Sequence, residues 1–212
     1  MSKFVSFFVK YITEIMVVFL LVYAFLPFLS PILFSFNSDS VLAKNIQNIY
    51  TLFCHQRPQS SVFLFGGEDS QMFYTLDELK ELEFVPENSL VSRGAGYWGN
   101  ENIGYKVAFC VRDSGIYPAL ALIGLFLVLW MNIKKKVIRI HWSVAILLML
   151  PMALDGAFQF LVMFFDLAWV PDWYLLSMSK KLITGALFGI GAALLVFPNL
   201  KDASGLGYNK KE

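Results

Sequence analysis

The chain has 212 residues, of which 57% are hydrophobic and 21 are phenylalanine. A soluble domain is nearer to half apolar, so this composition indicates a protein with a large lipid-facing surface. The formal net charge is +1, so no bulk electrostatic argument favours binding to nucleic acid.

Four apolar runs are long enough to cross about 30 Å of hydrocarbon as helices. They cover Tyr11–Phe36, Gly115–Ile133, Trp142–Phe165 and Leu182–Leu200. The first run is too long for a signal peptide and no small-x-small cleavage site follows it, so we expect a retained helix, kinked at Pro27 and Pro31. The sequence therefore predicts an all-α integral membrane protein with four transmembrane helices and a small outer-face loop subdomain.

Basic residues gather beside three ends of these runs. They are Lys3 and Lys10 before the first run, Lys134, Lys135, Lys136 and Arg139 between the second and third, and Lys201, Lys210 and Lys211 after the fourth. In a four-helix topology all three segments lie on one side, which the positive-inside rule makes cytoplasmic. We therefore expect a multi-pass protein of the cell membrane with both termini in the cytoplasm and residues 37–114 outside.

This topology divides the chain into four regions. They are 1–36 with the first transmembrane helix, 37–114 with an outer amphipathic helix and loop subdomain, 115–200 with helices two to four, and 201–212 as a cytoplasmic tail. Apolar residues recur at helical spacing from Leu42 to Phe53, which predicts the amphipathic helix. Thr75 and Glu78 form a capping box that opens a short helix, and Arg93–Asn100 is typical of a glycine-rich turn.

Three short motifs carry residues that could perform chemistry. They are Cys54-His55-Gln56-Arg57-Pro58, Cys110-Val111-Arg112-Asp113 and Asp155-Gly156-Ala157-Phe158-Gln159. The first two bracket the outer region, so we expect Cys54 and Cys110 at the same membrane level. Asp155 falls midway along the third predicted helix, with Gln159 one turn nearer the outer face. A carboxylate inside the bilayer is costly, so we expect Asp155 to face the bundle and to have a functional role.

Together these motifs resemble an uncharacterised family of small prokaryotic polytopic membrane proteins, a domain of unknown function. The resemblance also includes Phe63–Gly67 and Thr184–Gly189, and it covers most of the chain from Cys54 onward. It implies a polytopic membrane protein with no established activity. The chain departs from the family pattern in a longer stretch between Gly67 and Cys110, and in Asp113, which replaces the second cysteine of a Cys-x-Arg-Cys motif.

The exchange of cysteine for Asp113 bears on the chemistry. Both residue types bind a cation as anions, whereas a disulfide cannot tolerate the exchange. Cys54, His55, Cys110 and Asp113 together offer two sulfurs, one nitrogen and one oxygen, a set suited to zinc. The alternative is a Cys54–Cys110 disulfide, since outward-facing cysteines pair in an oxidising compartment. The sequence leaves both alternatives open.

The leading hypothesis is a membrane protein with an outer metal site, for which zinc is the candidate ion. As an enzyme it would use zinc-bound water as the nucleophile, with Asp155 and Gln159 as catalytic residues, on a lipid or another membrane-embedded substrate. The rival hypotheses are a disulfide-stabilised structural or assembly protein, a cation transporter, and a thiol–disulfide exchange protein, against which the lack of a Cys-x-x-Cys motif counts. The expected partners are the lipid bilayer and either another membrane protein or a second copy of the chain, and nothing indicates nucleic acid.

Overall fold

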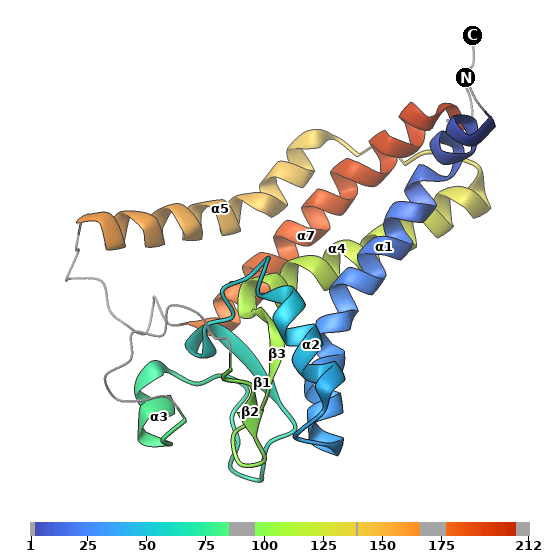
Figure 1. The fold of residues 1–212 in the computed structure, drawn as a ribbon. Helices are drawn as coiled ribbons and strands as arrows, with labels where there is room; N and C mark the ends of the chain where they lie inside the picture. The colour runs from blue at the N-terminus through green and yellow to red at the C-terminus, as the bar shows by residue number, and fades with distance from the viewer. Residues whose placement is uncertain (1–2, 85–95, 139, 166–176, 207–212) are drawn as a thin grey trace. The chain divides into compact units, whose positions relative to one another are not determined.

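The computed structural model of the protein describes residues 3–84, 96–138, 140–165 and 177–206. In chain order its elements are α1 (Lys3–Phe36), α2 (Val41–Tyr50), η1 (Pro58–Ser60), β1 (Ser61–Leu64), α3 (Leu76–Glu81), β2 (Gly99–Asn100), β3 (Gly104–Cys110), α4 (Val111–Lys134), α5 (Trp142–Phe165), α7 (Met178–Lys201) and η2 (Asp202–Leu206) (Figure 1). The chain divides into two compact units. The first contains Met1–Ala24, Gly115–Val170 and Ile183–Glu212, and the second contains Phe25–Ser114 and Pro171–Leu182.

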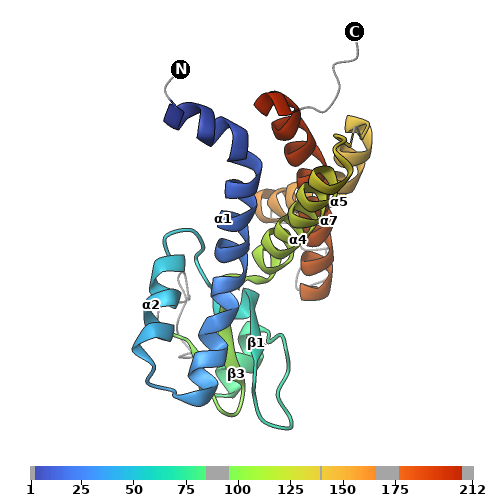
Figure 2. The ribbon, with the colours of Figure 1, turned by 90° about the vertical axis from the view of Figure 1, so that its right-hand side faces the viewer.

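Among the described residues, four helices are long and apolar enough to cross a membrane. Their spans are Lys10–Phe36, Val111–Lys134, Trp142–Val162 and Met178–Ser204. These spans match the four apolar runs, so the predicted helical membrane protein is confirmed. Backbone angles in α1 stay helical through Pro27 and Pro31, where we expected a kink, because membrane helices accommodate proline. The non-helical residue in α1 is Tyr11, with φ of −110° and ψ of 15°, and the bend is visible in Figure 2.

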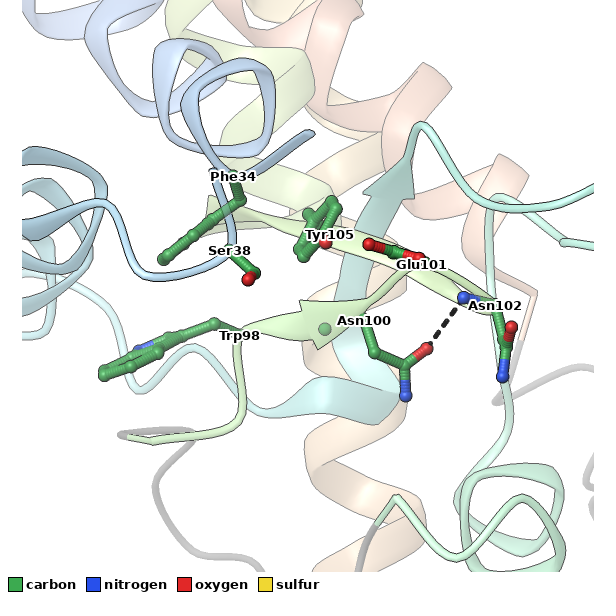
Figure 3. A pocket seen from close by; sticks show the side chains of 8 residues that line it. Phe34, Ser38, Trp98, Asn100, Glu101, Asn102 and Tyr105 are labelled. Carbon is green, nitrogen blue, oxygen red and sulfur yellow. Dashed lines mark hydrogen bonds between the residues drawn. The ribbon is translucent and has the colours of Figure 1, made fainter. Parts of the chain in front are cut away.

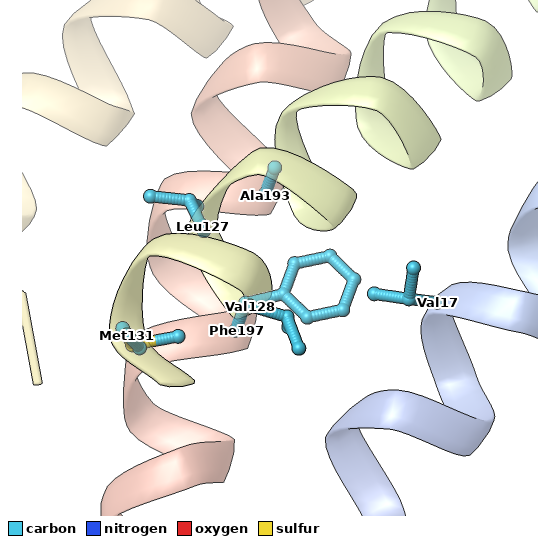
Figure 4. Close-up of a cluster of buried hydrophobic side chains, with 6 residues drawn as sticks. All are labelled: Val17, Leu127, Val128, Met131, Ala193 and Phe197. Atoms are coloured by element: carbon cyan, nitrogen blue, oxygen red, sulfur yellow. The ribbon is translucent and has the colours of Figure 1, made fainter. Parts of the chain in front are cut away.

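The core of the first unit lies where α1, α4 and α7 meet. Its buried side chains are Val17 from α1, Leu127, Val128 and Met131 from α4, and Ala193 and Phe197 from α7 (Figure 4). Glycines bring α4 and α7 together: a Cβ atom added at Gly124 would collide with the ring of Phe197, and one added at Gly189 would collide with the backbone of Ile116. The small residues of α7 therefore allow close helix packing.

Helix α5 is the least buried of the four membrane helices. It meets α7 near its own N-terminal end, where a Cβ atom added at Gly191 would lie 2.7 Å from the backbone oxygen of Ala145. Further along, α5 diverges from α7 (Figure 1). Its exposed apolar side chains include Leu147, Leu154 and Phe164. Lipid is the natural solvent for such a surface.

A polar contact joins three helices at one end of the first unit. The Nζ atom of Lys201, whose residue is 1% exposed, lies 2.6 Å from Oε1 of Glu14. Asn132 donates a hydrogen bond of 3.1 Å from Nδ2 to the same oxygen. These residues come from the first half of α1, the end of α4 and the end of α7, so the lysine-bearing ends of three helices lie together. The predicted topology requires this arrangement, while the side of the membrane that it occupies stays a prediction.

The second unit contains a small antiparallel sheet that we did not predict. Its strand order is β1-β3-β2, and Ser61 pairs with Cys110 while Phe63 pairs with Lys106. Two steps along β1 therefore oppose four steps along β3, which means that β3 bulges just before Cys110. The sheet adds to the expected loop subdomain. It escaped prediction because β1 and β3 are about 45 residues apart in the chain and show no local pairing signal.

Helix α2 and the end of α1 cover this sheet. As predicted, α2 is amphipathic, and Ala43, Ile46 and Tyr50 are buried. The ring of Phe34, near the end of α1, stacks on the ring of Tyr105 in β3, with 5.6 Å between the ring centroids. Aromatic packing therefore anchors the sheet to the helices on either side of the α1–α2 turn.

The capping box of the short helix α3 is present as predicted. The hydroxyl of Thr75 accepts a hydrogen bond from the backbone N–H of Glu78, whose carboxylate accepts one from the backbone N–H of Thr75. The predictions for residues 93–95, residue 139 and residues 207–212 fall outside the described residues.

Candidate metal and thiol site

Three of the four predicted metal ligands meet in the second unit. The Sγ atoms of Cys54 and Cys110 and a carboxylate oxygen of Asp113 all lie within 4.8 Å of one another. Sulfur ligands on a tetrahedral zinc ion stand about 3.8 Å apart, so side-chain adjustments of about 1 Å would suffice to bind one. His55 is exposed and lies outside this group. We call Cys54, Cys110 and Asp113 the thiol–carboxylate cluster.

Cys54 sits in a tight turn after α2. The helix ends at Tyr50, and the backbone N–H of Cys54 still bonds to the carbonyl of Tyr50 at 3.0 Å. Two residues later, Gln56 has a φ of 49°, in the left-handed region that non-glycine residues seldom adopt. The backbone N–H of Gln56 points back at the Cys54 sulfur, 3.5 Å away. This turn directs the Cys54 side chain to the cluster and leaves His55 exposed.

Cys110 and Asp113 flank the junction between β3 and α4. Cys110 is the last residue of the strand, and Asp113 lies in the first turn of the helix that begins at Val111. The helix dipole favours a carboxylate at this position. The thiol of Cys110 donates a hydrogen bond of 3.0 Å to Oδ2 of Asp113. The three-residue spacing thus brings sulfur and oxygen together, as the sequence suggested.

The third residue of the Cys-His-Gln motif has a structural role. Gln56 is 1% exposed, and its Nε2 donates hydrogen bonds of 2.9 Å to the carbonyls of Gln47 in α2 and Ala108 in β3. Ala108 lies within the bulge of β3, where the strand ladder leaves backbone groups unpaired. Gln56 therefore ties the Cys54 turn to the strand that carries Cys110.

Lys106 is a functional candidate that our reading of the sequence missed. It lies in β3 and is 0% exposed, and its Nζ donates a hydrogen bond of 2.8 Å to the backbone carbonyl of Gln56. Fully buried lysines are rare and costly. The available signal was one lysine inside the otherwise uncharged run Gly104–Cys110.

The pKa values of the two thiols in the cluster shift in opposite directions. A hydrogen bond from Cys110 lowers the pKa of Cys54 to about 7. The same hydrogen bond, together with burial, raises the pKa of the Cys110 thiol. Burial lowers the pKa of Lys106 to about 7, although a Cys54 thiolate opposes that shift. The shifts of the two thiols make Cys54 the more acidic thiol of the pair.

The two predicted catalytic residues belong to the first unit. Asp155 is 5% exposed in the middle of α5, and Nε2 of Gln159 donates a hydrogen bond of 2.9 Å to its Oδ2. The expected i to i+4 pairing on one helix face is therefore present. Asp155 is buried within its unit, as expected for a carboxylate in a membrane helix.

A cavity of about 400 Å³ lies elsewhere in the second unit (Figure 3). Phe34, Trp98 and Tyr105 line one part of it, and Glu101 and Asn102 from the β2–β3 turn line another. No residue of the three motifs contributes to its lining. The cavity therefore gives no support to the predicted site.

The state of the two thiols also tests the alternative prediction of a Cys54–Cys110 disulfide. Both cysteines are free in the structure, which does not confirm a structural disulfide. The proximity of the sulfurs nevertheless leaves their chemistry open to both metal binding and oxidation.

Comparison with known proteins identifies a family for part of the chain. Residues 102–195 match a family model described as "Predicted membrane protein (DUF2085)". This region contains Cys110, Asp113 and Asp155 but does not reach the Cys54 turn. No curated protein and no solved structure matches the chain. Over residues 102–195 the chain is therefore similar to a membrane-protein family of unknown function, which confirms at that level the resemblance drawn from its motifs.

Proposed function

We propose that this membrane protein binds a divalent cation of the zinc class through Cys54, Cys110 and Asp113. The observation that carries the proposal is the convergence of two sulfurs and one carboxylate oxygen within 4.8 Å. The ligands come from two chain segments more than 50 residues apart, and Gln56 braces those segments against each other. Thiolate and carboxylate ligands in a set of three suit zinc and leave its fourth position open.

The open position favours catalysis over a purely structural ion. Structural zinc sites use four protein ligands, whereas catalytic sites keep one position for water or substrate. Zinc supplies a Lewis acid that makes bound water nucleophilic near neutral pH. We also propose that Asp155 is a catalytic base of the first unit, that Gln159 orients its carboxylate through the hydrogen bond to Oδ2, and that the substrate is a lipid or another membrane-embedded molecule.

The orientation of the protein is part of the proposal. The Glu14–Lys201 contact gathers the lysine-bearing ends of α1, α4 and α7 at one end of the first unit. The positive-inside rule assigns that end to the cytoplasm. The thiol–carboxylate cluster then lies at the outer face, because β3 and the Cys54 turn fall between the outer ends of α1 and α4 in the chain.

A cobalt titration tests the metal site directly. Reduced, metal-free protein in detergent should develop the absorption of cobalt–thiolate bonds, and zinc should displace the cobalt. Cys54→Ser, Cys110→Ser and Asp113→Asn should each weaken binding by more than about 100-fold, since even outer-shell changes cost 10–100-fold. His55→Ala is the matched control and should bind as the parent does. The absence of a thiolate band, or equal binding by the Cys110→Ser variant, would overturn the proposal.

A second variant separates binding from catalysis. Asp155→Asn should bind cobalt as tightly as the parent, because Asp155 is not among the three ligands. In zinc-loaded protein supplied with phospholipid vesicles, the parent should release a hydrolysis product that Asp155→Asn does not. Equal product release by both proteins would refute the role of Asp155 as base and leave the metal site intact.

A further inference from the structure

We propose that Cys54 and Cys110 form a redox-active dithiol that exchanges with a disulfide substrate. This activity uses two residues of the proposed metal site but requires no metal. The two sulfurs lie within 4.8 Å of each other, whereas a disulfide bond is about 2.05 Å long. The sulfurs must therefore approach by at most about 3 Å, which rotation about the Cα–Cβ bonds can supply.

Accessibility favours Cys54 as the attacking thiol. Both cysteines are only partly buried, and the residues on either side of Cys54, Phe53 and His55, are exposed. A disulfide in solution can therefore reach the Cys54 turn. Attack by the more accessible sulfur leaves Cys110 behind it as the second, resolving thiol.

Two neighbouring groups fit the requirements of exchange. The Nζ atom of Lys106 donates a hydrogen bond of 2.8 Å to the Gln56 carbonyl, which holds the turn that carries the Cys54 thiol. The Asp113 carboxylate already accepts the hydrogen bond of the Cys110 thiol at 3.0 Å. Lys106 is thus a positioning residue for the first step, and Asp113 is the proton acceptor for the second.

The reaction balances in two steps. The Cys54 thiolate attacks one sulfur of a substrate R–S–S–R, the substrate bond breaks, and one RS⁻ leaves as Cys54–S–S–R forms. Cys110 then passes its proton to Asp113 and attacks the Cys54 sulfur, which expels the second RS⁻. That anion takes the proton from Asp113. Overall the Cys54 thiolate and the Cys110 thiol are oxidised to one disulfide, while the substrate disulfide is reduced to one thiolate, RS⁻, and one thiol, RSH.

The experiment is a redox titration of the full chain in detergent with a chelator present. The protein is equilibrated in mixtures of oxidised and reduced glutathione, and free thiols are then counted by a mass-tagged maleimide. Because the chain has two cysteines, the expected result is a change from two tags to none in one reversible, two-electron transition. Persistence of both tags in fully oxidised buffer, or a disulfide that reduced glutathione cannot reopen, would overturn the proposal.

Variants identify the roles within the pair. Cys54→Ser should leave Cys110 unable to form an internal disulfide. Lys106→Met should slow the oxidation by oxidised glutathione about tenfold or more, because the turn that carries the attacking sulfur loses the hydrogen bond that holds it. Lys44→Met removes a surface lysine from the same unit and is the matched control. Equal rates for Lys106→Met and the parent would refute the positioning role.

The metal-site proposal and the dithiol proposal can each be refuted without refuting the other. Cobalt binding is measured with both thiols reduced, whereas the redox titration is run without metal. A protein that binds cobalt but keeps both tags under oxidation refutes the dithiol alone. A protein with a reversible two-electron transition and no cobalt–thiolate band refutes the metal site alone.

Discussion

Replacement of Gly191 by alanine should weaken the attachment of α5 to α7. The added Cβ atom would lie 2.7 Å from the backbone oxygen of Ala145 and 2.8 Å from Cγ of Met149. The optimal separation of such atoms is about 3.5 Å, so each contact falls short by about 0.8 Å. The side chain of Met149 can rotate away, but the Ala145 oxygen moves only with the helix backbone. Helix α5 must therefore retreat from α7 along the part of its length where the two are in contact.

This displacement of α5 should lower the free energy of unfolding. Overpacking in a well-packed contact costs about 1–3 kcal/mol. For a chain of this size, each kcal/mol lowers the midpoint of thermal unfolding by about 2–4 °C. We place Gly191→Ala near the middle of the range, because the opposite face of α5 is largely exposed and the helix can move into lipid. The midpoint should fall by about 4–8 °C.

Thermal unfolding in one detergent, followed by circular dichroism, measures this effect. The matched control is Gly67→Ala, whose added Cβ atom would come no nearer than 3.7 Å to its neighbours. That variant should unfold within about 2 °C of the parent. A Gly191→Ala protein with the midpoint of the parent would refute the close approach of α5 and α7.

Three further predictions concern charge and topology. Lys201→Met should lower the unfolding free energy by about 1–3 kcal/mol, because it leaves a partly buried Glu14 carboxylate without its cation, and adding Glu14→Gln should recover part of the loss in the same unfolding assay. The rate of Cys54 alkylation by iodoacetamide should rise with pH through about 7, because its lowered pKa yields the reactive thiolate above that pH and the thiol below it; a midpoint near 9 would contradict this. Reporters fused after Asn100 and after Glu212 should report opposite sides of the membrane, and a shared side would rule out the four-helix topology.

The membrane helices could be predicted because their signal is local. An uninterrupted apolar run of about 20 residues can form little other than a membrane-spanning helix. The predicted ends of such a helix therefore lie within a few residues of the observed ends. The capping box at Thr75 is local in the same sense, since both hydrogen bonds fall within one turn. The sheet could not be predicted this way. Strand β3 gains its partners from β1 and the Trp98 region, and such pairing depends on contacts between distant segments.

The candidate site was predicted in its residue types but not in its geometry. Cysteine and aspartate three residues apart indicated that Cys110 and Asp113 would meet, and the motif pointed to Cys54 as their partner. The position of His55 could not be foreseen, because the left-handed conformation of Gln56 decides which side of the turn each side chain takes. Lys106 escaped notice because charged residues in short strands usually face solvent.

The two buried glutamines, Gln47 and Gln56, also affect how strand β3 could interact with other chains before the second unit has folded. Gln47 donates to the carbonyl of Lys106 at 2.6 Å, and Gln56 donates to that of Ala108. Their side-chain amides act in place of a neighbouring strand, so the carbonyls of Lys106 and Ala108 are not available to the backbone of another chain. A chain in which α2 has not docked would lack the Gln47 hydrogen bond to the carbonyl of Lys106. Unpaired backbone groups of a strand can pair with another chain, so the docking of α2 protects β3 from such association.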